Sequence, residues 1–228
     1  SNHPASTAAA CNAQQVPCIG IVRGDELNSS SNESLLFCES QNMQLQFISR
    51  EAYQKRNNSA WIQSLYAQYG NVYIVPEGGN NLQGRVGAQD IVQLIPSEYD
   101  YITVSAGTGT TFLGISDSIS SNTHLRAYIP MHNGNKYITD WHTTHGNWDA
   151  TDLFHFGGFG KYNMELIQFM NNFYQVTNIP LDMVYTAKMM SGIFQDIQDG
   201  YYKQGSKILA IHTGGLQGNN SIATLLDY

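Results

Sequence analysis

Apolar residues recur along the chain in short runs that alternate between the period of a strand and the period of a helix. Helices that separate apolar strands indicate parallel β-α-β units, so the predicted fold class is α/β with open parallel sheets. The predicted strands are Cys18 to Val22, Leu45 to Ile48, Val72 to Val75, Tyr101 to Val104, Leu125 to Ile129 and Lys207 to Ile211. The predicted helices include Ser34 to Ser40, Ala52 to Tyr69, Gln83 to Leu94 and Thr110 to Ser118.

Two later segments have the helical period. The region that separates them from the earlier strands does not. Leu166, Phe169, Met170 and Phe173 fall on one helix face, which predicts a core stripe. A further helix around Ile193 stops near Gly200, whereas residues 131–160 are predicted to be irregular. The turn at Glu77 to Asn80 breaks the strand–helix alternation and predicts a boundary between a smaller domain, 1–78, and a larger domain, 79–228.

Composition narrows the class of partner. A 228-residue chain with 42% hydrophobic residues is globular, and its net charge of -7, with 11 scattered Lys and Arg, argues against a nucleic acid. No apolar run reaches the roughly 18 residues that cross a bilayer, so no membrane partner is expected. A small anion is still compatible, because backbone N–H groups bind anions without net positive charge.

Cysteine and histidine patterns predict neither a disulfide framework nor a metal site. Cys11, Cys18 and Cys38 are odd in number and lack metal-type spacing, which together with the absence of a signal peptide favours a cytoplasmic location. His142 and His145 lie close in sequence, but zinc needs further ligands that this loop does not supply.

The stretch YITVSAGTGTTFLG, Tyr101 to Gly114, predicts a strand that turns through small residues into a helix. Such a turn presents backbone N–H groups and hydroxyls to one point, which suits a phosphate monoester. No Lys-Ser or Lys-Thr follows, and the glycine spacing fits the dinucleotide pattern poorly. A plain strand-to-helix turn stays an alternative. Two further glycine turns, Pro76 to Asn81 and His212 to Gly218, either converge on the same ligand or simply end strands.

Five motifs in this order carry a family resemblance: SNH, VPEGGNNLQGRVGAQDI, SAGTGTT, PLDMVYTAKMMSGI and ILAIHTGGLQG. They resemble the 1-aminocyclopropane-1-carboxylate (ACC) deaminase and D-cysteine desulfhydrase family over essentially the whole chain. The resemblance implies the tryptophan synthase β-like fold, which is fold type II, and the cofactor pyridoxal 5'-phosphate (PLP).

The resemblance also implies roles for individual residues. The phosphate of PLP would be bound by Gly107, Thr108, Gly109, Thr110 and Thr111. Asn2 would bind the ring hydroxyl, Tyr185 would lie against the ring as a catalytic residue, and Thr186 would meet the pyridine nitrogen. The substrate would contact Ser1, also assigned to proton transfer, together with Asn2, His3 and Phe159.

Thr186 bears on the reaction. A carboxylate at this position would keep the ring nitrogen protonated, whereas a hydroxyl leaves a weaker electron sink. The ring-opening deaminases of the family have Glu here and the desulfhydrases have Thr. We therefore expect α,β-elimination from a small amino acid, with release of ammonia and a 2-oxo acid; ACC deamination is the alternative.

Two departures from the family pattern limit that expectation. The Schiff-base lysine of the family lies upstream of Ser-Asn-His, so the chain is interpreted as an N-terminally incomplete piece that is inactive alone; Lys188 is interpreted as structural. Phe159 stands where relatives commonly have tyrosine. A non-catalytic binder of PLP or another phosphate ligand is therefore the alternative of a different class. From the family we also expect a homodimer.

Overall fold

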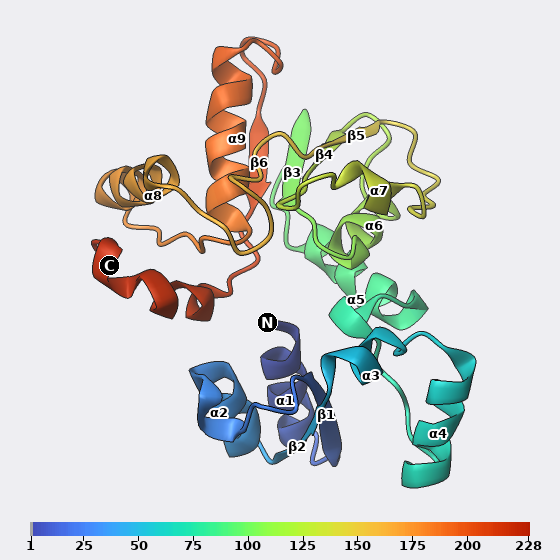
Figure 1. The fold of residues 1–228 in the computed structure, drawn as a ribbon. Helices are drawn as coiled ribbons and strands as arrows, with labels where there is room; N and C mark the ends of the chain where they lie inside the picture. Colours follow the sequence, from blue (N-terminus) through green and yellow to red (C-terminus); the bar gives the residue numbers. More distant parts are fainter. Residues whose placement is uncertain (1) are drawn as a thin grey trace. The chain divides into compact units, whose positions relative to one another are not determined.

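In a computed structural model that describes residues 2–228, the chain divides into two compact units between Val75 and Pro76 (Figure 1). Each unit contains its own parallel sheet. The boundary expected after residue 78 falls inside the glycine turn that begins the second unit. The Thr110 hydroxyl donates to the carbonyl oxygen of Gly78 at 3.0 Å, which ties this turn to the residues that follow it.

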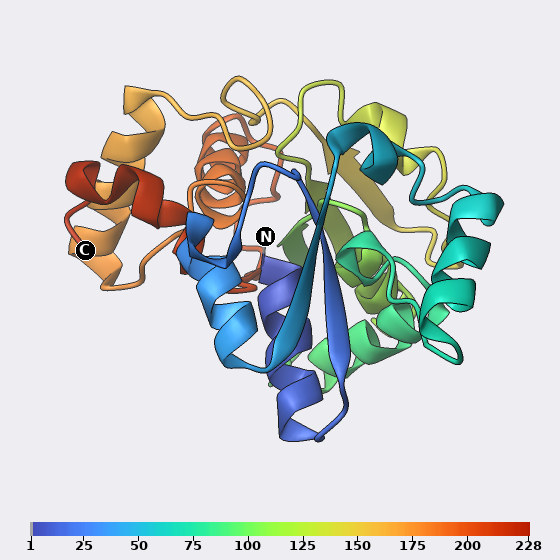
Figure 2. The same cartoon turned by 60° about the horizontal axis from the view of Figure 1, so that its bottom comes forward.

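The first unit is built around the two-stranded sheet of β1 and β2. Its elements are α1 (Asn2–Ala13), β1 (Cys18–Arg23), a 3-10 turn (Ser29–Ser31), α2 (Glu33–Ser40), β2 (Met43–Ile48), α3 (Arg50–Gln54) and α4 (Ser59–Tyr69). Helices α1 and α2 pack together beside the strands (Figure 2). Ala8, Cys38 and Met43 form their shared core.

Two predictions for the first unit are wrong. The single helix expected from Ala52 to Tyr69 is two helices. The Asn58 side chain accepts the N–H of Ala60 at 2.8 Å and caps the start of a new helix, α4. The strand expected at Val72 to Val75 does not form: within residues 2–228 this segment pairs with neither sheet. An apolar run alone does not make a strand.

The second unit carries a four-stranded parallel sheet in the order β5-β4-β3-β6. Its elements are a 3-10 turn (Glu77–Gly79), α5 (Leu82–Gln93), β3 (Tyr101–Ser105), α6 (Thr110–Ser116), β4 (His124–Tyr128), α7 (Asn135–Ile138), β5 (Trp148–Thr151), α8 (Met164–Thr177), α9 (Thr186–Gln198), β6 (Ile208–Ile211) and a 3-10 segment (Leu216–Leu225). Strand β5 and helix α7 correct the prediction that residues 131–160 are irregular. Trp148 and Ala150 of β5 pack on the core while Asp149 joins a polar cluster, an alternation too short to read from sequence.

Both faces of this sheet are covered. Phe112, Leu125 and Trp141 belong to a core on the side of α5 and α6, and Tyr128, Met189 and Ile193 to a core on the side of α9 (Figure 1). The stripe predicted on α8 is confirmed at Leu166 and Met170, which are fully buried. Among residues 2–228 no helix has the length and apolar character to cross a membrane.

Candidate functional site

The glycine bend between β3 and α6 has a backbone that only glycine suits. Gly109 has a φ of 88°, in the left-handed region where a side chain is strained. A methyl group at Gly109 would also lie 2.4 Å from the indole of Trp141, which is buried behind the bend. The backbone therefore packs directly on Trp141, and its shape is fixed by that contact.

The donors that this bend offers to a ligand are mainly backbone N–H groups. Thr110 donates its hydroxyl hydrogen to Gly78, and its oxygen lies 3.0 Å from the hydroxyl of Thr108, which must then be the donor of that bond. Both hydroxyl hydrogens are thus used within the protein. The first N–H groups of a helix have no partner inside the helix, so those at the start of α6 are left for an anion, with Thr111 adding a hydroxyl.

Tyr185 lies against the bend. A methyl group on Gly107 would lie 3.0 Å from the Tyr185 hydroxyl oxygen and 3.4 Å from its ring. The ring also meets Phe159 edge to face, with centroids 5.8 Å apart. The structure thus brings together three of the predicted residues that are distant in sequence, and the Tyr185 ring fits beside Gly107 because this residue has no side chain.

The Tyr185 hydroxyl is held in its neutral form. Burial, together with the nearby carboxylates of Asp182 and Glu77, raises its pKa to about 12. A phenol with this pKa keeps its proton at neutral pH. Tyr185 is therefore suited to donate a hydrogen bond or a proton, not to act as a base.

Asp182, which the sequence analysis did not single out, organises the start of α9. Its carboxylate is buried and accepts the backbone N–H groups of Val184, Tyr185 and Thr186, each at 2.9 Å. An acidic residue just before a helix is a common cap, and this was the signal that could have found it. Asp182 fixes the backbone from which the Tyr185 ring projects.

Thr186 is fully buried, and its hydroxyl is engaged with Asp182. It donates to Asp182 Oδ2 at 2.8 Å and accepts the Asp182 N–H at 2.8 Å. A hydroxyl has one hydrogen and two lone pairs, so it retains only one accepting position for a ligand. Its predicted contact with a pyridine nitrogen stays a prediction.

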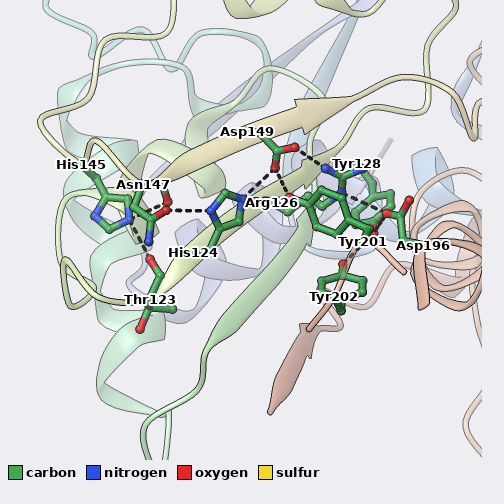
Figure 3. Close-up of polar contacts among 10 residues, drawn as sticks. All are labelled: Thr123, His124, Arg126, Tyr128, His145, Asn147, Asp149, Asp196, Tyr201 and Tyr202. Atoms are coloured by element: carbon green, nitrogen blue, oxygen red, sulfur yellow. Dashed lines mark hydrogen bonds and ion pairs between the residues drawn. The ribbon is translucent and has the colours of Figure 1, made fainter. Parts of the chain in front are cut away.

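A buried polar cluster holds α9 against the sheet (Figure 3). Arg126 of β4 pairs with Asp149 of β5 and, at 3.0 Å, with Asp196 of α9. The hydroxyl of Tyr128 also donates to Asp196. Because one helix carries both Asp196 and the Thr186 end, this cluster helps to fix Tyr185 relative to the bend.

The third glycine turn packs on the segment that leads to Tyr185. The His212 ring contacts the carbonyl of Pro180 at 3.0 Å, and Asn219 accepts the N–H of Met183 at 2.9 Å. Strands β3 and β6 are parallel neighbours, so their following turns lie at the same sheet edge. The turn at Gly78 touches the bend directly, since a methyl group there would lie 2.5 Å from the Thr108 hydroxyl.

Other predicted residues have no such placement. Asn2 and His3 belong to α1 of the first unit, and their assignment to cofactor and substrate stays a prediction; Ser1 lies outside the described residues.

The His145 ring is buried and contacts the carbonyl oxygens of Thr123 and Asn147, each at 3.1 Å. Within residues 2–228 no three His, Cys, Asp or Glu side chains gather in a group that could hold a metal ion.

Comparison with known proteins places this arrangement in context. The mitochondrial bifunctional D-cysteine desulfhydrase/ACC deaminase of Arabidopsis thaliana is 25% identical over 251 aligned positions, which cover 96% of this chain and 62% of the relative. The chain is thus similar in sequence to D-cysteine desulfhydrases and ACC deaminases. No protein-family model matches it. The chain thus spans less than two thirds of the length of the Arabidopsis protein.

Solved structures confirm the predicted fold class. An ACC deaminase homologue superimposes with a TM-score of 0.77 at 23% identity, over 99% of this chain and 75% of that one. A pyridoxal 5'-phosphate-dependent aspartate racemase superimposes with a TM-score of 0.56 at 13% identity, over 92% and 69%. The chain therefore has the α/β fold with parallel sheets of the fold type II enzymes.

Proposed function

We propose that the second unit binds pyridoxal 5'-phosphate and that the protein catalyses α,β-elimination from a small amino acid, releasing ammonia and a 2-oxo acid. The observation that carries the proposal is the position of Tyr185 on the glycine bend. An aromatic ring beside a backbone anion cup suits a phosphorylated aromatic cofactor. When bound, PLP supplies an electron sink for the α-carbon of an amino acid.

The bend fits the phosphate group. Glycine at positions 107 and 109 exposes the backbone, and the N–H groups at the start of α6 supply donors that match phosphate oxygens. The hydroxyls of Thr108 and Thr110 shape the cup, since their hydrogens are already used. Phosphate specificity would thus come from the main chain, with Thr111 as the side-chain donor.

Tyr185 and Phe159 would form the wall against which the ring and substrate lie. The neutral Tyr185 hydroxyl can donate to a leaving group or to a carboxylate. Phe159 is 57% exposed and adds apolar surface beside Tyr185 without a second hydroxyl. Acid chemistry in this unit would therefore rest on Tyr185.

Thr186 favours a substrate with a good β leaving group. Because its hydrogen goes to Asp182, the hydroxyl can meet a ring nitrogen only as a neutral acceptor. A neutral acceptor stabilises a protonated ring less than a carboxylate does. Elimination of sulfide from D-cysteine places less demand on the electron sink than opening of a cyclopropane ring.

The test is a comparison of two substrates with the protein translated from its complete coding sequence. With PLP present, D-cysteine should yield sulfide, ammonia and pyruvate much faster than ACC yields ammonia. Thr186→Ser, which keeps the hydroxyl, should preserve the ratio of the two rates, and Thr186→Val should change it. Faster turnover of ACC than of D-cysteine would show that the protein is an ACC deaminase instead. If the protein binds PLP but catalyses neither reaction, it is a non-catalytic PLP binder.

A further inference from the structure

Lys188 of α9 is a buried cation that donates hydrogen bonds to two carbonyl oxygens of one loop. Its side chain is 1% exposed, and its Nζ donates to the carbonyl oxygens of His155 at 2.8 Å and Gly158 at 2.7 Å. Charge-assisted hydrogen bonds of this length are among the stronger ones in proteins. Lys188 therefore ties α9 to the loop that follows β5.

That loop has a backbone that needs such a tether. Phe156 has a φ of 48°, and Gly157, Gly158 and Gly160 have values of 91°, 118° and 66°. A run of left-handed residues makes few regular backbone bonds, and a non-glycine residue in this region is strained. Without an external partner, a glycine-rich segment of this kind would sample many conformations.

The loop presents Phe159 to Tyr185. Phe159 directly follows Gly158, whose carbonyl Lys188 holds, and its ring meets Tyr185 at a centroid distance of 5.8 Å. Lys188, Thr186 and Tyr185 all belong to the start of α9, so one helix end carries both the tether and the ring. We propose that Lys188 is a positioning residue: its ammonium holds the His155–Gly158 backbone so that Phe159 forms the substrate wall beside Tyr185.

The effect of Lys188 on substrate binding rests on the proposed PLP-dependent function, whereas its contact with the loop does not. The expected functional effect is on substrate binding, because Phe159 and not Lys188 would touch the substrate. Loss of the tether should raise KM for D-cysteine roughly tenfold and change kcat less than about twofold. A purely structural lysine would instead lower the fraction of active protein, which reduces kcat and leaves KM unchanged.

The tether should respond to pH above neutrality. Burial, partly offset by the Asp182 carboxylate, lowers the pKa of Lys188 to about 8, so the closed loop binds fewer protons than an open loop in which the lysine is exposed. Within the loop, His155 Nδ1 accepts the Gly157 N–H at 3.0 Å. The other charged or titratable groups around this loop are His132, Lys161 and Glu165.

Hydrogen exchange of the loop tests the tether without cofactor or substrate. In Lys188→Met, amides of residues 153–161 should exchange about tenfold faster than in the wild type, while those of α8 stay unchanged. Lys203→Met, at an exposed lysine outside the loop, is the matched control and should behave as the wild type. Equal loop exchange in folded Lys188→Met would overturn the proposal.

A pH series tests whether opening of the loop exposes Lys188, and it needs no folded Met variant. From about pH 7 to about pH 9.5, wild-type loop protection, corrected for intrinsic exchange, should rise, because opening the loop exposes Lys188 and takes up a proton. Lys188→Arg should show no such rise, because guanidinium stays charged in both states. Wild-type protection that does not change over this range would refute the tether. Since no PLP is present, failure of the proposed function, seen as no PLP binding or turnover, is a separate result.

Discussion

Replacing Gly109 by alanine tests the geometry of the bend from which the site is built. Two costs follow from the structure. The backbone at a φ of 88° strains any L side chain by about 1–2 kcal/mol. The new methyl group would lie 2.4 Å from the Trp141 indole, and Trp141 is itself stacked on Phe112 with ring centroids 4.8 Å apart.

The overlap with Trp141 cannot be relieved by a simple side-chain rotation, because the indole is buried. Overpacking of this kind costs about 1–3 kcal/mol, so the whole loss should be about 2–5 kcal/mol. In a chain of this size, Tm should fall by about 4–20 °C. Urea denaturation of the second unit, followed by tryptophan fluorescence, measures the free energy directly.

Gly87→Ala is the matched control for Gly109→Ala. Gly87 lies inside α5, and a methyl group there meets open space. Because alanine favours helix over glycine, this variant should be more stable than the wild type by about 0.5–1 kcal/mol. Gly109→Ala with wild-type stability, or the same effect at both positions, would refute the described bend.

Three further outcomes are expected. Asp182→Ala removes the acceptor of three N–H groups at the start of α9, and thermal unfolding should show a loss of about 2–4 kcal/mol. Gly192→Ala puts a methyl group 2.6 Å from the Tyr128 ring, which should cost about 1–3 kcal/mol in urea denaturation. Burial lowers the pKa of Lys188 from 10.5 to about 8, so the unfolded state binds more protons between these values. The unfolding free energy of the wild type relative to Lys188→Met should therefore rise with pH across that range; a fall would contradict the burial of the cation.

The sequence predicts the sheet of the second unit well because its strands are continuous apolar runs. Tyr101 to Val104 and Leu125 to Ile129 stand out since a parallel sheet is buried on both faces. The bend could be located because glycine and threonine after such a run restrict the backbone. The motif order, not any single turn, connected the bend to Tyr185.

Several features of the site depend on contacts that no local pattern contains. Asp182 acts through three N–H groups that only the folded turn brings to one carboxylate. The role of Lys188 depends on two carbonyl oxygens more than 25 positions away. The hydroxyls of Thr108 and Thr110 were predicted as ligand donors, and only the structure shows that protein acceptors take their hydrogens.

The most direct measurement is a fluorescence titration with PLP and, in parallel, with pyridoxal, which lacks the phosphate. Trp141 lies directly behind Gly109, so a chromophore bound at the bend should quench its emission. The full-length protein should bind PLP saturably and pyridoxal at least about tenfold more weakly, because the bend supplies charge-assisted bonds to phosphate. Tyr185→Ala should weaken both ligands. Equal affinity for the two, or quenching that Tyr185→Ala leaves unaltered, would contradict a cofactor held by its phosphate at the bend and by its ring at Tyr185.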